Sequence, residues 1–160
     1  MKTIGSTIIM LALASSLFAD NGKELKLASP DGTHEIVFYQ KQVSPAVNEL
    51  CYRVDYKSQP VVNESRAGLE LDNRIWEMAL GVRNLKQPAC WMDNLEVDSV
   101  TYQPETNLTW QPLYGERSSV RDHYRAGTLC LSKKDNSGYR LNIEVRAYNE
   151  GVAFRYFFPE

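Results

Sequence analysis

The sequence lacks the residue patterns of several common kinds of enzyme. Its 160 residues include only two His and three Cys. No pair of these residues has the short spacing of zinc ligands, and no Ser occupies a G-x-S-x-G nucleophile elbow. A glycine-rich phosphate-binding loop is also missing. We therefore predict no metal site in this chain, no nucleophile-elbow hydrolase and no P-loop enzyme.

Excess positive charge is also missing. The chain has 18 Lys and Arg against 20 Asp and Glu, which gives a formal net charge of −2. Proteins that bind nucleic acid or anionic lipid surfaces usually carry a strongly basic area. The sequence therefore predicts neither a nucleic-acid partner nor a partner at a membrane surface.

No apolar run is long enough to span a bilayer, which takes about 20 residues in a helix. The longest run covers residues 4–18, follows a Lys and is closed by Ala19. This order is typical of a secretory signal peptide, with a buried N-terminal helix as the alternative. We therefore predict a signal peptide at residues 1–19, a mature domain at residues 20–160, no membrane anchor, and export to the periplasm or outside the cell.

Export would place the cysteines in a compartment where disulfides form. Cys51, Cys90 and Cys130 cannot all pair within one chain. One disulfide with one free thiol, or three buried thiols, are both consistent with the sequence.

Apolar residues alternate with polar ones through most of the mature chain, which predicts β-strands. The clearest case places Leu141, Ile143 and Val145 on one face of a strand that ends at the turn signal 149–151. Residues 42–47 are predicted as a loop, and residues 73–80 as either a short helix or a loop. The length suits one core. We therefore predict a mostly β fold, an antiparallel β-sandwich.

Several motifs in fixed order identify a family resemblance. Residues 110–116 read WQPLYGE and are followed by Arg121 and Tyr124; residues 149–160 read NEGVAFRYFFPE, and residues 27–32 match an opening strand and turn. This ordered set resembles the N-terminal domain of glycoside hydrolase family 97, the α-glucosidases and α-galactosidases of polysaccharide-degrading bacteria.

The resemblance implies a super-sandwich similar to galactose mutarotase, a carbohydrate partner and a Gram-negative host. It also implies that the chain is incomplete, because in family members the sandwich continues and a catalytic (β/α)₈ barrel follows. The barrel carries the catalytic carboxylates, and calcium is bound by residues outside the segment seen here. We thus expect no catalytic residue, no cofactor in this chain, and the barrel as its partner domain.

The expected function is therefore that of a carbohydrate-binding or scaffold domain of an exported α-glycosidase, inactive alone towards α-glucosides and α-galactosides. The alternatives are a stand-alone carbohydrate-binding module and a non-functional gene remnant. The substrate and the stereochemical outcome stay open.

The site candidates are Trp110, Tyr114, Glu116 and Arg121, as carbohydrate or barrel contacts. Both aromatic rings suit sugar stacking, but a place in the core or in a domain interface is favoured for them. For Glu116, a structural ion pair with a neighbouring Arg is favoured over a barrel contact.

Two further predictions concern polar residues on strands. His123 is expected to be a surface or hydrogen-bonded residue rather than part of a nucleophilic site. Glu144, Arg146 and Arg155 share the polar face of adjacent strands, where cross-strand ion pairing is expected.

Overall fold

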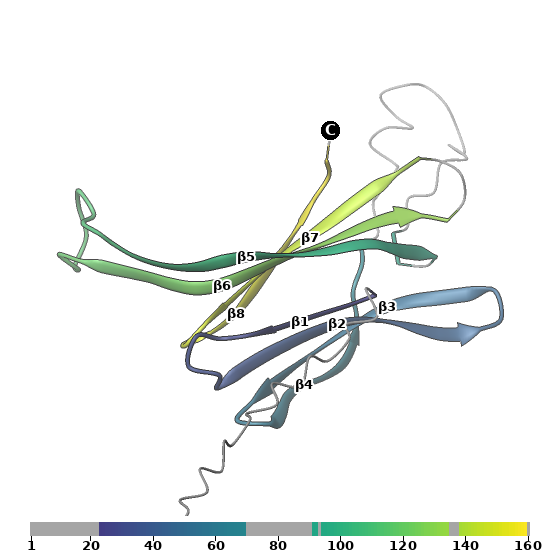
Figure 1. Cartoon of the computed structure of the whole chain (residues 1–160), viewed down its shortest axis with the longest axis horizontal. Coiled ribbons are helices and arrows are strands. Elements are labelled where there is room, and N and C mark those ends of the chain that lie inside the picture. The colour runs from purple at the N-terminus through teal and green to yellow at the C-terminus, as the bar shows by residue number, and fades with distance from the viewer. Residues whose placement is uncertain (1–22, 70–90, 93, 135–137, 160) are drawn as a thin grey trace, which may run out of the picture.

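The structure is a computed structural model that describes residues 23–69, 91–92, 94–134 and 138–159. These residues form two antiparallel sheets of four strands each. One sheet has the order β1 (Glu24–Ala28), β2 (His34–Ser44), β3 (Val47–Tyr56) and β4 (Gln59–Arg66). The other has the order β5 (Leu95–Trp110), β6 (Val120–Lys133), β7 (Arg140–Tyr148) and β8 (Gly151–Phe157). The sheets lie in two layers (Figure 1). The predicted mostly β, antiparallel sandwich is thus confirmed.

The strands form where side chains alternate between a dry face and a wet face. In β7, Leu141, Ile143 and Val145 are buried, whereas Arg140 and Arg146 are exposed. This alternation confirms the predicted face of the strand. The residues proposed as a helix or loop, 73–80, lie outside the described part of the chain.

The core fills the space between the inner faces of the two sheets. Its fully buried side chains include Leu25, Ile36, Phe38, Leu50, Leu129, Leu141 and Ile143. Phe38 of β2 meets Phe154 of β8 edge to face, with ring centroids 5.3 Å apart, and Tyr52 of β3 meets the same ring at 5.3 Å. These aromatic contacts join one sheet to the other.

Two-residue turns connect β2 to β3, β3 to β4 and β7 to β8. Lys57 and Ser58 both have positive φ, at 48° and 62°, as the two-residue turn between β3 and β4 requires. The predicted loop over residues 42–47 is wrong, because β2 continues to Ser44 and β3 begins at Val47. The chain reverses within two residues there because the long ladder between β2 and β3 satisfies the backbone on both sides.

The turn between β7 and β8 is also shorter than predicted. Tyr148 pairs with Gly151, so the turn has two residues and Gly151 already belongs to β8. The turn predicted at this place is nevertheless confirmed, since β7 and β8 pair antiparallel across it.

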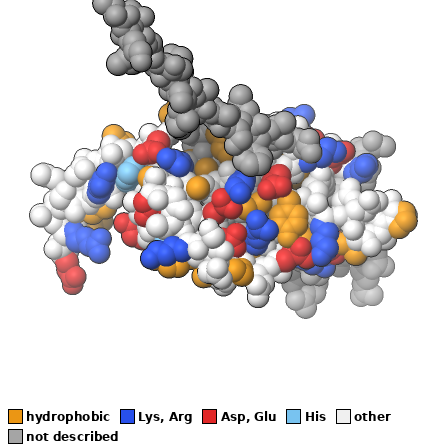
Figure 2. Space-filling model, turned by 60° about the horizontal axis from the view of Figure 1, so that its bottom comes forward, with side chains coloured by type: hydrophobic (Ala, Val, Ile, Leu, Met, Phe, Trp, Pro, Cys, Tyr) orange, Lys and Arg blue, Asp and Glu red, His pale blue; other side chains and the backbone are white. Residues whose placement is uncertain are grey.

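Charge is compensated locally on the outer face of the β1–β4 sheet. Ion pairs there join Lys26 to Glu35, Lys41 to Glu64, Arg53 to Asp55 and Arg66 to Glu49. Figure 2, which brings this side forward, shows acidic and basic side chains interspersed over the surface. Separately, none of the residues that the structure describes forms a helix long and apolar enough to cross a membrane.

Candidate functional site

The four site residues predicted from the sequence lie at the end of a projecting hairpin. Beyond a bulge between Gln103 and Thr106, β5 and β6 continue to pair up to Trp110 and Val120. We call residues 106–124 the arm, and its connecting residues 111–119 the tip loop. Figure 1 shows the arm extending past the other strands of both sheets. Its ladder positions the tip loop away from the hydrophobic core.

The aromatic residues of the tip are exposed. Tyr114 is 90% exposed and Trp110 is 52% exposed, and Leu113 and Leu108 beside them are 99% and 64% exposed. The sequence favoured a place in the core or in a domain interface for both rings. Their exposure excludes the core. Large apolar side chains gathered on a projecting element are typical of a contact site.

The polar candidates, Glu116 in the tip loop and Arg121 in β6, do not pair with each other. Glu116 is exposed and makes no ion pair within the described residues, so the predicted structural ion pair is wrong. The sequence could not show this, because residues adjacent in a loop need not bring their charged groups together. Arg121 instead donates to the Asn107 side chain, at 3.0 Å from Nε to Oδ1. Glu116 thus keeps its carboxylate available to a ligand.

The strand register divides the candidates between two faces of the arm. Trp110 pairs with Val120, and Thr109 pairs with Arg121. Directly paired residues point to the same side of a sheet, and adjacent residues point to opposite sides. Trp110 and Arg121 therefore occupy opposite faces of the arm. The tip loop joins the two strands that carry them.

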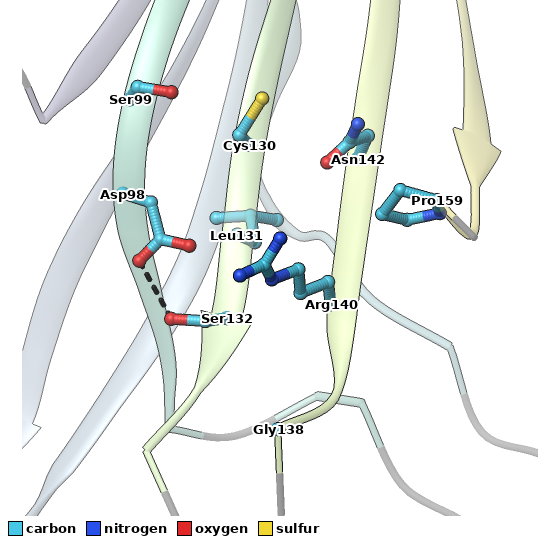
Figure 3. A pocket seen from close by; sticks show the side chains of 9 residues that line it. All are labelled: Asp98, Ser99, Cys130, Leu131, Ser132, Gly138, Arg140, Asn142 and Pro159. Carbon is cyan, nitrogen blue, oxygen red and sulfur yellow. Dashed lines mark hydrogen bonds between the residues drawn. The ribbon is translucent and has the colours of Figure 1, made fainter.

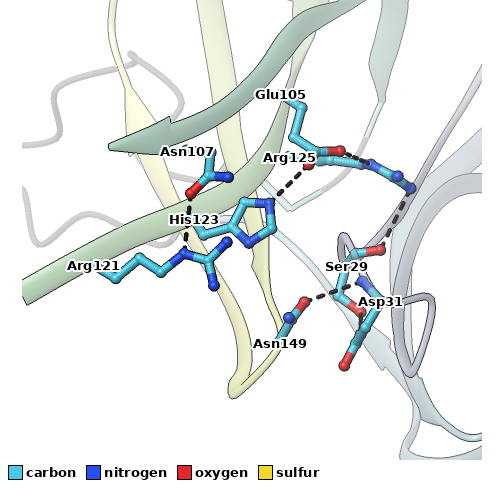
Figure 4. A network of polar contacts seen from close by, with 8 residues as sticks. All are labelled: Ser29, Asp31, Glu105, Asn107, Arg121, His123, Arg125 and Asn149. Atoms are coloured by element: carbon cyan, nitrogen blue, oxygen red, sulfur yellow. Dashed lines mark hydrogen bonds and ion pairs between the residues drawn. The ribbon is translucent and has the colours of Figure 1, made fainter. Parts of the chain in front are cut away.

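A polar network holds the base of the arm against the sandwich (Figure 4). The Glu105 carboxylate lies 2.7 Å from Nε2 of His123 and accepts a hydrogen bond from Nε of Arg125 at 3.0 Å. Arg125 also donates to the carbonyl oxygen of Ser29, in the β1–β2 turn, at 3.4 Å. His123 and Arg125 together lower the pKa of Glu105. The hydrogen-bonded state predicted for His123 is confirmed.

The same turn is tied to the β7–β8 turn. The backbone N–H of Asp31 donates to the side-chain oxygen of Asn149 at 3.1 Å. Sequence reasoning missed Glu105, Asn107 and Asn149. Pairing of β5 with β6 brings the first two to their partners, and the packing of one sheet on the other brings Asn149 to Asp31. The bulge, which contains a Pro, was the one local signal for the base of the arm.

Two other polar clusters of the β5–β8 sheet differ in their bonding. Arg155 donates to Glu144 at 2.5 Å, as the expected cross-strand pairing requires. The guanidinium of Arg146 lies over the Tyr124 ring, 4.5 Å from its centroid, and Nη1 donates to the Tyr148 hydroxyl at 3.4 Å. Arg146 is therefore held by aromatic groups rather than by Glu144.

The described residues contain no group of three or more His, Cys, Asp or Glu side chains that could hold a metal ion. Within the tip loop, Glu116 is the one acidic residue. Glycoside hydrolysis generally uses two carboxyl groups about 5–10 Å apart. The tip loop by itself offers an aromatic surface and one carboxylate, a set suited to contact rather than bond cleavage.

Known proteins match this chain over most of its length. The chain is 26% identical over 150 residues to a retaining alpha-galactosidase of Bacteroides thetaiotaomicron, an alignment that covers 94% of this chain and 19% of the relative. Structures of a glycoside hydrolase family 97 enzyme from Pseudoalteromonas sp. strain K8, in complex with panose or acarbose, are 27% identical, with a TM-score of 0.67. They cover 85% of this chain, which spans 18% of theirs.

A family description agrees with these relatives. The profile of the glycosyl hydrolase 97 N-terminal domain matches residues 27–160. The match includes every strand from β2 to β8 as well as the arm. Because it covers well over half of the chain, this protein belongs to the glycosyl hydrolase 97 N-terminal domain family.

Proposed function

We propose that this chain is the N-terminal domain of an exported α-glycosidase and contacts carbohydrate through the tip of its arm. The exposure of Tyr114 and Trp110 at the end of a projecting hairpin carries this proposal. Family membership supports it, and the relative from Pseudoalteromonas is described in complexes with panose and acarbose. α-Glucosides or α-galactosides are the proposed ligands.

The chemistry of the tip fits a sugar. An aromatic ring offers a flat apolar face, and a pyranose has an apolar C–H face that packs on it. The hydroxyl groups of a sugar stacked on Tyr114 would meet the carboxylate of Glu116. Charged groups form stronger hydrogen bonds than neutral ones, so this side chain would fix the orientation of the ring. Arg121, on the face opposite Trp110 and bonded to Asn107, would instead contact the barrel or a second sugar unit.

The proposed role includes no bond cleavage by this chain. Catalytic carboxylates and calcium ligands would be supplied by a (β/α)₈ barrel on which the arm rests, and this chain would hold no cofactor. The lone carboxylate of the tip loop supports this division of labour. Incubation of the chain with nitrophenyl α-glucoside and α-galactoside should give no turnover, and clear turnover would refute this part of the proposal.

Export is part of the same proposal. A signal peptide at residues 1–19 would direct the chain to the periplasm, leaving a mature domain from Asp20. Expression in a Gram-negative host followed by N-terminal sequencing should find Asp20 first in the periplasmic fraction. A chain that keeps Met1 and stays in the cytoplasm would contradict it.

Calorimetric titration with panose tests the sugar contact. The wild-type chain should release or absorb heat at millimolar panose, and Tyr114→Ala should weaken the binding by at least about tenfold, because the stacking face is lost. Tyr56→Ala removes an exposed aromatic ring from the other sheet and serves as the control that should bind normally.

The outcomes separate the alternatives. A folded monomer that gives no heat with panose contradicts the sugar contact. A chain that aggregates and gives no heat supports a non-functional remnant, since open sheet edges recruit other strands. Tight binding by the isolated chain, unaffected by Tyr114→Ala, would favour a stand-alone binding module that uses another surface.

A further inference from the structure

The outer face of the β5–β8 sheet contains a polar hollow, distant from the tip of the arm. Its volume is about 660 Å³, and its lining includes Asp98, Cys130, Ser132, Arg140 and Asn142. Figure 3 shows these side chains projecting from three adjacent strands towards one another. Such a volume falls in the range of small-molecule sites.

Three of the lining groups have no partner in the described structure. The guanidinium of Arg140, the amide of Asn142 and the thiol of Cys130 make no hydrogen bond or ion pair with a described residue. By contrast, Ser132 donates to the carboxylate of Asp98, at 2.7 Å between the oxygens. The hollow thus presents unused donors on β6 and β7 opposite an oriented acceptor on β5.

The charge of the lining identifies the class of ligand. Among the described residues that line it, Asp98 and Arg140 are the only charged ones, and their charges cancel. An anion would be repelled by the carboxylate, and a cation by the guanidinium. A neutral ligand whose groups both donate and accept satisfies both sides at once, as vicinal hydroxyl groups do.

Apolar surface is available beside these groups. Pro159 lines the hollow, and Phe157, which pairs with Asn142 across β7 and β8, is 44% exposed. A pyranose would place its C–H face there and its hydroxyl groups towards Asp98 and Arg140. We propose that this hollow is a second carbohydrate site, separate from the tip of the arm.

The distance along β6 keeps the two sites independent. β6 leaves the tip loop at Val120 and reaches the hollow at Cys130, a separation of about 33 Å along an extended strand. One monosaccharide cannot reach both. This inference rests on the proposed function only for the class of ligand. Its test measures a change at the hollow and not at the tip of the arm.

Cys130 provides a local reporter of occupancy. Its side chain is partly exposed, whereas Cys51 is buried with 2% exposure. We would measure the rate of Cys130 alkylation by iodoacetamide, using mass spectrometry of its peptide, with and without maltotriose or galactose. A bound sugar should slow the reaction at least about fivefold and with saturation, because it covers the thiol.

Variants make the result specific. Arg140→Ala and, separately, Asn142→Ala should abolish the protection, and Arg53→Ala, an exposed Arg on the other sheet, should keep it. Circular dichroism identifies any variant that fails to fold. If only one of the two hollow variants folds, the loss of protection in that variant is sufficient for the test. Tyr114→Ala should keep the protection of Cys130 even if it abolishes binding at the tip.

Two results would overturn the proposal. An alkylation rate of Cys130 that neither sugar changes at any concentration up to its solubility limit excludes a sugar at the hollow. Protection by sodium sulfate but by neither sugar, at matched ionic strength, would assign the hollow to an anion instead. Neither result bears on panose binding at the tip, so the two proposals fail independently.

Discussion

At the scale of single residues, Asp31 organises the turn between β1 and β2. Its carboxylate accepts hydrogen bonds from the Ser29 hydroxyl at 2.6 Å and from the Thr33 backbone N–H at 3.0 Å. The Ser29 bond and then the Thr33 bond lower the pKa of Asp31 from 3.8 to about 2. Hydrogen bonds to the charged form favour that form.

This shift predicts how the stability of the turn depends on pH. A carboxyl group with a lowered folded pKa stabilises the fold above its unfolded pKa and loses that effect as the pH falls through its folded pKa. The contribution of Asp31 should therefore be complete above about pH 5 and disappear between about pH 4 and pH 2. Urea unfolding of wild type and Asp31→Asn should differ at pH 7 and converge near pH 2; a difference that persists at pH 2 contradicts the assignment.

Gly68 has no room for a side chain. A Cβ there would lie 2.5 Å from the Trp91 carbonyl oxygen and 2.9 Å from the Cα of Met92. Both are backbone atoms, so the segment itself must shift. Gly68→Ala should lower the free energy of unfolding by about 1–3 kcal/mol, as overpacking does.

Gly151 supplies the matched control for this substitution. It has the same φ of 156°, but no atom lies within 4 Å of its added Cβ. Gly151→Ala thus reports the backbone effect alone, and chemical denaturation of both variants isolates the clash. Equal losses of stability in the two variants would show that the close approach to Trp91 costs nothing.

At the scale of elements, the polar network at its base should set how firmly the arm is held. Glu105→Gln removes the negative charge that His123 and Arg125 share. Amide hydrogen exchange of the arm strands should then accelerate by roughly threefold to tenfold, because local opening of the ladder becomes easier.

Glu116→Gln is the control for this variant, since Glu116 has no ion pair within the described residues. Its arm amides should exchange at the wild-type rate. If Glu105→Gln also leaves them unchanged, the arm is held by its strand ladder alone and the network has no positioning role.

The elements divide into those that the sequence predicts and those that it does not. In β7 and β8 the inward side chains alternate strictly, because these strands face the core on one side and solvent on the other. β5 could not be recognised in this way. Most of its residues from Asp98 to Trp110 are exposed on both faces, so no apolar period marks the strand.

At the scale of the whole molecule, Phe38 joins the two sheets. It is fully buried and packs against Tyr52 of its own sheet and Phe154 of the other. Phe38→Ala should lower the free energy of unfolding by about 3–5 kcal/mol, because it leaves a cavity between the layers. Urea denaturation followed by tryptophan fluorescence measures this loss.

Phe157→Ala is the control for an aromatic side chain outside the core. The ring is 44% exposed on the outer face of β8, so its removal should change stability by only about 0.5 kcal/mol. Similar losses in both variants would mean that the space between the sheets is not the principal core.

The candidate site was only partly predictable, because a local motif shows which residues it contains but not whether they are buried in the folded molecule. Trp110, Tyr114, Glu116 and Arg121 were found from a local motif, and hairpin pairing indeed brings them to one end of the arm. Their exposure was not predictable, because burial depends on whether the other sheet reaches that far. The ordered motifs were sufficient to predict the family. The arm could not be predicted from them, because it is defined by the register between β5 and β6.

The central claim is that the exposed tip of the arm is a carbohydrate contact. The most direct test is a titration of the ¹⁵N-labelled chain with panose, followed by NMR chemical shifts of the backbone amides. Leu113, Tyr114 and Glu116 should shift with saturation in the wild-type chain and stay fixed in Trp110→Ala. Tip-loop amides that remain unchanged at saturating panose would contradict the claim.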